Sequence, residues 1–399
     1  MRVFLYRLYQ AIMKVGVVLM NWKDATLIEG ENSILKVPDL LKKDGYSTVL
    51  MVTDKNITNL GLTKPLLEAL QRSGISCVVY DDTVPNPTID NIEEALKMYK
   101  ANNCQAIIAF GGGSSMDCAK GVGARLARPN RTIPQLRGVL KVMKRIPCLI
   151  AIPTTAGTGS ETTIAAVISN PATHEKYAVN DFHLVPKYAI LDPLITLNLP
   201  PQITSTTGID ALTHAVEAYI GRSNTKQTKE MARLAVKLIF DNLYTAYSNG
   251  KDIIARDNML KASFYAGIAF TKAYVGYVHA IAHTLGGYYR VPHGLANAVI
   301  LPYVLDYFGS SAYKPLAELA DLIGISAVGD SDEVKAKKFI AKIRGLEVSM
   351  EIPTKIEGIQ EADIPGMVNN ALKEANPLYP VPKILFAEDL RKLYDMIRK

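Results

Sequence analysis

The strongest constraint on the fold is a change of pattern near Pro200-Pro201. From about residue 30 to 200, continuous apolar runs alternate with segments of helical periodicity. Such runs are typical of parallel strands that are covered on both faces. The apolar runs are 48–52, 77–80, 106–110 and 148–152, and the clearest helical segments between them are 62–73 and 89–102. The alternation predicts a doubly wound α/β domain, suited to binding a nucleotide.

After Thr204 comparable strands are absent and the pattern becomes helix after helix. The clearest predicted helices are 208–219, 226–248, 253–267 and 275–288. We therefore predict three parts: an amphipathic extension (1–22), an α/β dinucleotide-binding domain (23–201) and an all-α metal-binding domain (202–399). Because the glycine-rich and histidine-rich motifs fall in different domains, we expect the active site in a cleft between them.

Four of the six histidines lie in two short segments of the helical half. Asp210 and His214 are four residues apart, as are His279 and His283, so each pair shares one helical face. His293 follows a proline, where a turn can bring it back toward the others. One carboxylate and three imidazoles complete a shell for a divalent ion such as Fe²⁺ or Zn²⁺. The alternative is a set of unrelated histidines on helix surfaces and turns.

A glycine-rich turn follows the apolar run 106–110 and precedes a helix expected to begin near Met116. Glycines let the backbone approach a pyrophosphate, and the helix start presents free N–H groups. A tight structural turn is the alternative. Lys120, one turn further on, is interpreted as a helix-surface residue.

Two further strand ends carry polar residues. Asp54 can accept hydrogen bonds from an adenosine ribose and repel a 2′-phosphate, or it can cap the next helix. Thr154, Thr155 and Thr158 follow the run 148–152, where their hydroxyls could hold the nicotinamide end of a cofactor or form an ordinary turn.

These motifs together resemble the iron-containing (group III) alcohol dehydrogenases, the family that includes lactaldehyde reductase and propanediol dehydrogenase. The resemblance runs from about residue 25 to the C-terminus and implies a dehydroquinate synthase-like architecture. It also implies NAD and one divalent metal, with Fe²⁺ favoured and Zn²⁺ possible. The implied metal ligands are Asp210, His214, His279 and His293, and the implied cofactor-binding residues are Asp54, Asn86, Gly112, Gly113, Ser114, Ser115, Asp117, Thr154, Thr155 and Thr158.

The implied reaction is the NAD(H)-linked interconversion of a small primary alcohol and its aldehyde. His283 is the histidine left over once the metal shell is full, so we expect it to serve the proton or hydride step; a fifth ligand or a packing role is the alternative. Phe270 and Tyr274 are the preferred pocket walls, ahead of Tyr277. The competing hypotheses are a metal-dependent hydrolase, a maleylacetate-reductase-like enzyme and a non-enzymatic metal-binding protein.

Composition limits the partners and the compartment. A net charge of +7 without runs of like charge favours a merely basic surface over a nucleic-acid partner. The four cysteines show no regular spacing and are interpreted as reduced core residues of a cytoplasmic protein. We also expect a homodimer.

The N-terminal segment is predicted to be an amphipathic helix. Arg7, Gln10, Lys14 and Asn21 line up on one helical face, and apolar residues occupy the rest. Arg7 and Lys14 disfavour a signal peptide and a spanning helix. We expect this helix to pack on the protein's own body or on a sister subunit, and a membrane-surface role is the lesser alternative.

Overall fold

A computed structural model describes residues 1–20, 23–171 and 175–399 of the chain. The chain divides into two compact units. The α/β unit comprises Trp22–Leu199, and the helical unit comprises Met1–Asn21 together with Pro200–Lys399. Asn21, which the sequence placed on the polar face of the first helix, lies outside the described residues.

The α/β unit is built on a parallel sheet of six strands in the described part of the chain, in the order β1-β9-β6-β4-β2-β3. The strands are β1 (Thr26–Glu29), β2 (Thr48–Val52), β3 (Ser76–Tyr80), β4 (Ala106–Gly111), β6 (Cys148–Pro153) and β9 (Tyr188–Leu191). Four of them match the predicted apolar runs to within one residue at either end. The fold class predicted from the sequence is confirmed.

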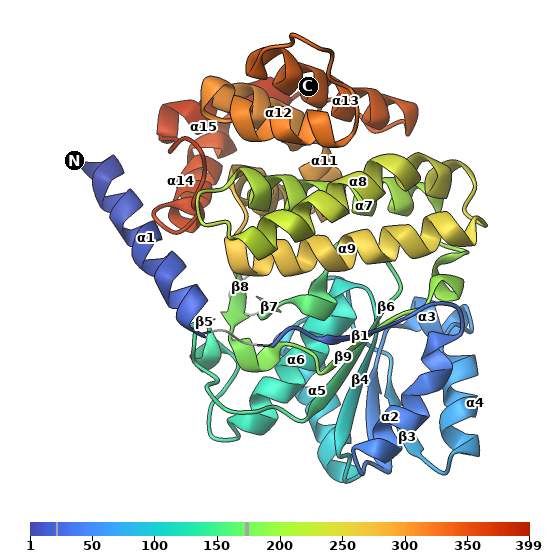
Figure 1. Ribbon diagram of the computed structural model, residues 1–399. Coiled ribbons are helices and arrows are strands. Elements are labelled where there is room, and N and C mark those ends of the chain that lie inside the picture. The colour runs from blue at the N-terminus through green and yellow to red at the C-terminus, as the bar shows by residue number, and fades with distance from the viewer. Residues whose placement is uncertain (21–22, 172–174) are drawn as a thin grey trace. The chain divides into compact units, whose positions relative to one another are not determined.

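Both faces of this sheet are buried, which explains why its strands are continuously apolar. Val49 and Met51 of β2 pack in one hydrophobic cluster, and Leu50 and Val52 pack in another. Figure 1 shows α2 (Val37–Lys43) and α4 (Lys64–Arg72) on one side of the sheet and α5 (Ile89–Ala101) and α6 (Gly113–Ala127) on the other.

The connections from β2, β4 and β6 lie at one edge of the sheet, because these neighbouring strands are parallel. The short helix α3 (Lys55–Asn59) follows β2, and α6 follows β4 three residues earlier than predicted. A smaller sheet of β5 (Gly138–Val139), β7 (Ala165–Asn170) and β8 (Glu175–Asn180), absent from the sequence-based prediction, flanks this region. Its strands are short or only partly buried, so their apolar signal is weak.

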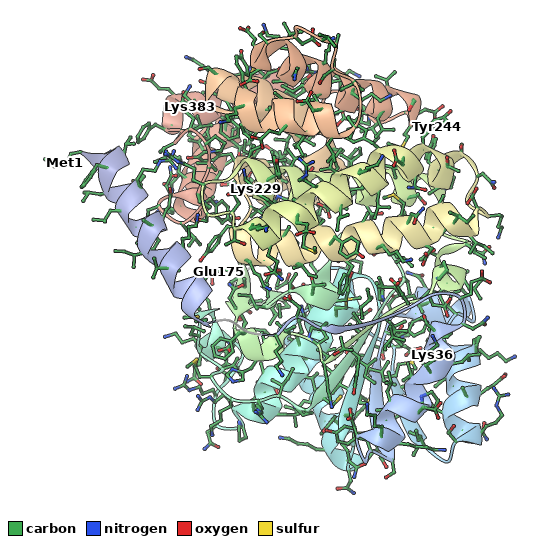
Figure 2. All side chains as sticks on the ribbon, viewed as in Figure 1. Met1, Lys36, Glu175, Lys229, Tyr244 and Lys383 are labelled. Atoms are coloured by element: carbon green, nitrogen blue, oxygen red, sulfur yellow. The ribbon has the colours of Figure 1, made fainter. Side chains whose placement is uncertain are left out.

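The main run of helices in the helical unit begins at Pro201. α7 (Pro201–Ile220) starts with a proline at its first position, where the missing N–H costs nothing. α8 (Lys226–Ser248) is capped by Thr225 and packs with α7 and α9 (Ile253–Ala273). The unit continues with α10 (Tyr277–Tyr289), α11 (His293–Phe308), α12 (Tyr313–Leu322), α13 (Asp332–Ser349), α14 (Ile364–Ala375) and α15 (Ala387–Ile397). Figure 2 shows side chains filling the layers between these helices.

The N-terminal helix α1 (Arg2–Met20) belongs to the helical unit. It contacts this unit through its polar face, since the side chains of Arg7 and Gln10 bond to main-chain carbonyls of residues 377–382. Among the described residues, no helix combines the length and the apolar content needed to cross a membrane.

Burial in the sheet-covering helices generates a stability prediction. Leu66 on α4 is fully buried, whereas Leu60 is 68% exposed. Leu66→Ala should lower the free energy of unfolding by about 2–5 kcal/mol, because it leaves a cavity between helix and sheet. Leu60→Ala, the same change on the surface of the same unit, should alter it by less than about 0.5 kcal/mol. Chemical denaturation of both variants measures the difference, and equal losses would refute the assigned packing.

Candidate active site

Three of the predicted metal ligands converge in the helical unit. Asp210 lies on α7, His279 lies on α10, and His293 is the first residue of α11. Asp210 Oδ1 is 3.8 Å from His279 Nε2 and 3.6 Å from His293 Nε2. One donor atom from each residue lies within 4.8 Å of the other two, a spacing at which a single ion can contact all three.

His214, the fourth predicted ligand, lies one turn after Asp210 and joins the cluster through its ring. The ring stacks on His279 with centroids 4.5 Å apart and on Phe270 with centroids 4.1 Å apart. His214 is buried, but its ring nitrogens are outside the group of mutually close donor atoms found among the described residues. Phe270, predicted as a pocket wall, thus lies against the ligand cluster.

Glu217 orients His279, a role that sequence reasoning missed. Its carboxylate accepts hydrogen bonds from the N–H groups of Gly276 (2.8 Å) and Val278 (2.9 Å) at the start of α10. The same carboxylate lies 2.6 Å from His279 Nδ1. A proton held on Nδ1 by this contact leaves the lone pair on Nε2, directed toward Asp210. The available signal was an acidic residue two turns after Asp210 on the same helical face.

Burial sets the protonation of this pair. Desolvation, and then the neighbouring His214, His293 and His283, hold the pKa of His279 well below its usual value, so the imidazole is neutral. Burial also raises the pKa of Glu217 to about 8, while hydrogen bonds from the main-chain N–H groups of Gly276, Val278 and His279 act in the opposite direction. A neutral imidazole is the form that binds a metal ion.

Asn297 is a second residue that the sequence analysis missed. It lies one turn after His293, and its Nδ2 contacts Asp210 Oδ1 at 2.6 Å and His293 Nε2 at 3.1 Å. The amide therefore links two of the predicted ligands. The signal in the sequence was a His-x-x-x-Asn pair at the start of α11.

A glycine allows α11 to start close to α7. A Cβ placed on Gly294 would lie 2.7 Å from the main-chain oxygen of Thr206, closer than real Cβ atoms approach. This close approach brings His293, the preceding residue, near Asp210 on α7.

His283 lies at the edge of the cluster. Its ring stacks on that of His293, with centroids 5.2 Å apart, and its Nδ1 lies 2.7 Å from Glu374 on α14. Glu374 also accepts a hydrogen bond from the Tyr379 hydroxyl. Although burial acts to raise it, the pKa of Glu374 lies below its usual value because His283 and Tyr379 stabilise the carboxylate.

The cluster fits a divalent cation by its own chemistry. His279 Nε2 is buried and has no hydrogen-bond partner within the part of the chain that the structure describes. A buried polar atom left in this state costs about 1–3 kcal/mol, whereas coordination would satisfy it. The donors, a carboxylate oxygen and imidazole nitrogens, are those preferred by Fe²⁺ and Zn²⁺.

In the α/β unit, the glycine loop (residues 111–115, after β4) packs directly on the threonine loop (residues 154–158, after β6). A Cβ on Gly113 would lie 3.1 Å from Thr158 Cγ2, and one on Gly112 would lie 3.6 Å from Thr155 Oγ1. The Thr154 N–H donates to the carbonyl of Gly111 at 3.1 Å. Two segments of the predicted cofactor site therefore lie together, beside the free N–H groups at the start of α6.

Asp54 and Asn86 both have local structural roles. Asp54 Oδ1 caps α3 by accepting from the N–H groups of Asn56 and Ile57, which is the alternative considered for this residue. Asn86 has a left-handed backbone (φ 58°), and its N–H donates to the Ser114 hydroxyl in the glycine loop. Ser115, by contrast, is buried beneath that loop.

Lys120 is fully buried, so its interpretation as a helix-surface residue is wrong. Its ammonium donates to main-chain and hydroxyl oxygens of Ser160 and Thr163 and to the carbonyl of Ala165. Asp117, predicted to bind cofactor, accepts from the Ser160 hydroxyl and the Val167 N–H. Burial lowers the pKa of Lys120 to about 8 and raises that of Asp117 to about 6, while their opposite charges act against both shifts. Both residues fix the segment that follows the threonine loop.

Comparison with known proteins decides the family. Residues 25–193 match the iron-containing alcohol dehydrogenase model, and residues 204–397 match the model of the C-terminal part of Fe-containing alcohol dehydrogenases. This chain belongs to the iron-containing alcohol dehydrogenase family. It is an NAD-linked oxidoreductase that interconverts an alcohol and an aldehyde.

Individual relatives of this iron-containing alcohol dehydrogenase cover most of its length. It is 38% identical to 1,3-propanediol dehydrogenase of Klebsiella pneumoniae over 87% of this chain and 90% of that one. It is 32% identical to lactaldehyde reductase of Escherichia coli, over 86% and 91% of the two chains. The solved alcohol dehydrogenase from Oenococcus oeni is 36% identical, with a TM-score of 0.91 over 94% of this chain and 99% of that one.

The position of Glu217 generates a prediction about metal affinity. Glu217→Ala removes the acceptor for His279 Nδ1 and for the two N–H groups at the start of α10, so divalent-metal affinity should fall by about 10–100-fold. Glu217→Gln keeps one acceptor oxygen and should lose less. Titration of metal-depleted protein with Fe²⁺ or Zn²⁺ measures both. Glu347→Ala, which removes a buried glutamate of α13, is the control and should bind metal as the wild type does. Unchanged affinity in Glu217→Ala would refute the orienting role.

Proposed function

We propose that Asp210, His214, His279 and His293 hold one Fe²⁺ ion and that the enzyme reduces a short aldehyde to a primary alcohol, or the reverse. The observation that carries the proposal is the buried His279 Nε2, held by Glu217 so that it faces the carboxylate of Asp210. The metal-depleted protein leaves this atom unsatisfied. Fe²⁺ is preferred to Zn²⁺ because of the family to which the chain belongs.

A divalent cation at this position lowers the pKa of an alcohol hydroxyl and polarises an aldehyde carbonyl. Side chains of this protein supply the apolar surroundings in which the effect of the cation on the hydroxyl or carbonyl is strong. Phe270, stacked on His214, gives the cluster an apolar wall, and Tyr274 is proposed as a second wall. Tyr277 is fully buried and hydrogen-bonded to Asn376 and Leu385, which agrees with its lower rank as a pocket residue.

His283 is proposed to serve the proton or hydride step. Glu374 holds its Nδ1, which fixes the ring and leaves Nε2 for a reacting group. Its side chain is about one-third exposed, in contrast to the 3% exposure of His279. Exposure of this kind allows exchange of a proton with solvent, which the deeply buried His279 cannot provide.

The cofactor NAD(H) is proposed to bind at the carboxyl edge of the parallel sheet. Gly112, Gly113, Ser114, Ser115 and Asp117 form or support the pyrophosphate turn, and Thr154, Thr155 and Thr158 receive the nicotinamide end. Asn86, joined to Ser114, and Asp54 are proposed to face the adenosine ribose.

The substrate is proposed to be a small diol or hydroxyaldehyde of the kind named in two relatives, a 1,3-propanediol dehydrogenase and a lactaldehyde reductase. A cytoplasmic location is supported by the four cysteines, all free thiols and three of them buried. Assembly as a homodimer stays a prediction from the sequence.

The metal and the histidines are tested together. His279→Ala should lose both the metal and the oxidation of NADH by short aldehydes, because it removes a donor atom from the cluster. His283→Ala should keep the metal, while kcat should fall ~10²-fold because a proton-transfer group is lost. Metal content per subunit is measured beside single-turnover kinetics on a panel of aldehydes, including 3-hydroxypropionaldehyde and lactaldehyde.

Each outcome of this experiment assigns a role. A His279→Ala protein with stoichiometric metal and full activity would refute the ligand set. Metal loss in His283→Ala would make His283 a ligand, and an unchanged rate would reduce it to a packing residue. Wild-type protein that carries metal but reduces none of the aldehydes would refute the substrate class.

Coenzyme choice is tested at Asp54. Asp54→Asn keeps a good helix cap for α3 but removes the negative charge. The preference for NAD over NADP is measured as the ratio of the two kcat/KM values. The free-energy difference that corresponds to this ratio should therefore fall by about 1–3 kcal/mol. Asp54→Gly should relax the preference similarly while also weakening the cap. A wild type that prefers NADPH, or an unchanged ratio in Asp54→Asn, would contradict the role.

A further inference from the structure

Helix α1 is attached to the helical unit by its polar side chains. The Arg7 guanidinium donates to the carbonyls of Val381 (2.7 Å) and Pro382 (2.9 Å). The Gln10 amide donates to the carbonyls of Pro377 (2.9 Å) and Tyr379 (2.8 Å), and Gln10 is buried. These four hydrogen bonds fix which face of α1 lies against the unit.

The opposite face of α1 is apolar and exposed. Phe4, Leu8, Ile12 and Val15 recur at helical spacing and form a stripe, in which each side chain is between 49% and 70% exposed. A surface helix ordinarily buries its apolar stripe and exposes its polar one, so α1 has the reverse orientation. Turning the stripe inward would break the bonds of Arg7 and Gln10 and leave main-chain carbonyls unsatisfied.

Helix α1 carries a net positive charge. Residues 2–20 contain Arg2, Arg7 and Lys14 and no acidic residue. Lys14 extends to the carbonyl of Arg222 at 3.4 Å. Burial, and then the charge of Arg222, lower the pKa of Arg7 to about 10.

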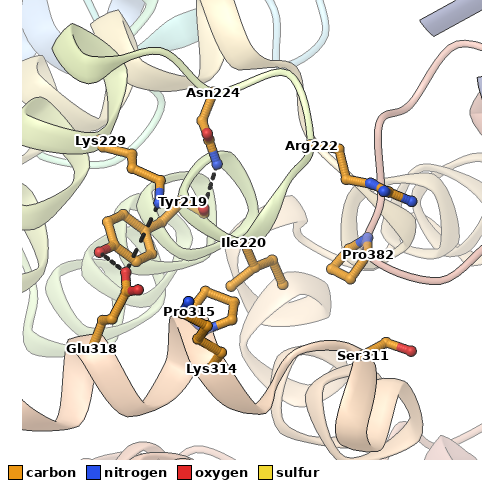
Figure 3. Close-up of a pocket in the computed structure, with 10 residues that line it drawn as sticks. All are labelled: Tyr219, Ile220, Arg222, Asn224, Lys229, Ser311, Lys314, Pro315, Glu318 and Pro382. Carbon is orange, nitrogen blue, oxygen red and sulfur yellow. Dashed lines mark hydrogen bonds and ion pairs between the residues drawn. The ribbon is translucent and has the colours of Figure 1, made fainter. Parts of the chain in front are cut away.

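Arg222 also lines a pocket of about 510 Å³ (Figure 3). Three of its ten lining residues are basic, Arg222, Lys229 and Lys314, and one is acidic, Glu318. Glu318 is engaged by the Tyr219 hydroxyl and by Lys229. The pocket shares Arg222 and Pro382 with the attachment site of α1, so the basic pocket adjoins the place where this helix meets the helical unit.

We propose that the apolar stripe of α1 and the adjoining basic pocket bind the surface of a membrane that contains anionic lipid. The stripe would enter the boundary between headgroups and acyl chains, while Arg222 and Lys314 meet lipid phosphates. A helix of 19 residues, about 28 Å long, lies along such a surface and does not need to span it. A second copy of the same surface is a poorer occupant, because two such faces would bring basic groups together without acidic partners on α1.

The test uses the full-length, metal-loaded enzyme and sedimentation with lipid vesicles. The wild type should bind vesicles of phosphatidylcholine containing phosphatidylglycerol, bind pure phosphatidylcholine more weakly, and lose binding as salt is raised. The variant Phe4→Glu/Leu8→Glu/Ile12→Glu should bind about 100-fold more weakly or worse, because three apolar groups no longer leave water. Arg222→Gln/Lys314→Gln should lose mainly the preference for anionic vesicles.

Controls separate this result from misfolding and from self-association. Val348→Glu changes an exposed apolar residue of α13 outside this surface and should bind vesicles like the wild type. All of these variants should keep alcohol dehydrogenase activity in solution. The proposal is overturned if the wild type does not bind anionic vesicles or if the triple variant binds them equally. It is also overturned if the triple variant only lowers the oligomer mass in light scattering, since a second copy would then cover the stripe.

Discussion

The metal cluster depends on one buried carboxylate. Glu217 accepts the N–H groups of Gly276 and Val278, so the start of α10 is fixed to α7 by a side chain. The same carboxylate fixes the ring of His279. Without this contact, the first turn of α10 would have to find other acceptors, and the imidazole could rotate. Asp210 and His279 lie on different helices, and their relative position therefore depends on Glu217, a residue that need not touch the ion.

The α/β unit organises its loops in a comparable way. The glycine and threonine loops both follow central parallel strands, so the sheet itself brings them to one edge. Their packing is close because glycine leaves room for Thr155 and Thr158. Lys120 and Asp117 then hold the segment that follows the threonine loop. Backbone proximity and buried ionic groups therefore help to position this part of the site.

The sequence predicted those features that leave a periodic or compositional signal. The strands β2, β3, β4 and β6 were found because both of their faces are apolar, and the histidines were found by their spacing. Glu217 and Asn297 were missed because the spacing of a polar residue along its own helix does not reveal its partner on another helix. Lys120 was placed wrongly for a related reason: a lysine is usually exposed, and its acceptors lie 40 or more residues away in the chain. The sequence pattern also could not predict which face of α1 lies against the helical unit, because the acceptors of Arg7 and Gln10 are main-chain carbonyls, which leave no signal in the sequence.

The burial of Lys120 has a chemical consequence. An amine must present a lone pair and an open approach in order to react with an acylating reagent, and the ammonium of Lys120 has neither while it is surrounded by the oxygens of Ser160, Thr163 and Ala165. The other lysines of the α/β unit for which contacts are described, such as Lys55 and Lys187, lie at the surface. Acylation of Lys120 therefore requires the segment around β7 to open. Modification of this side chain would report that the α/β unit has opened, and its protection would report that the unit has stayed closed.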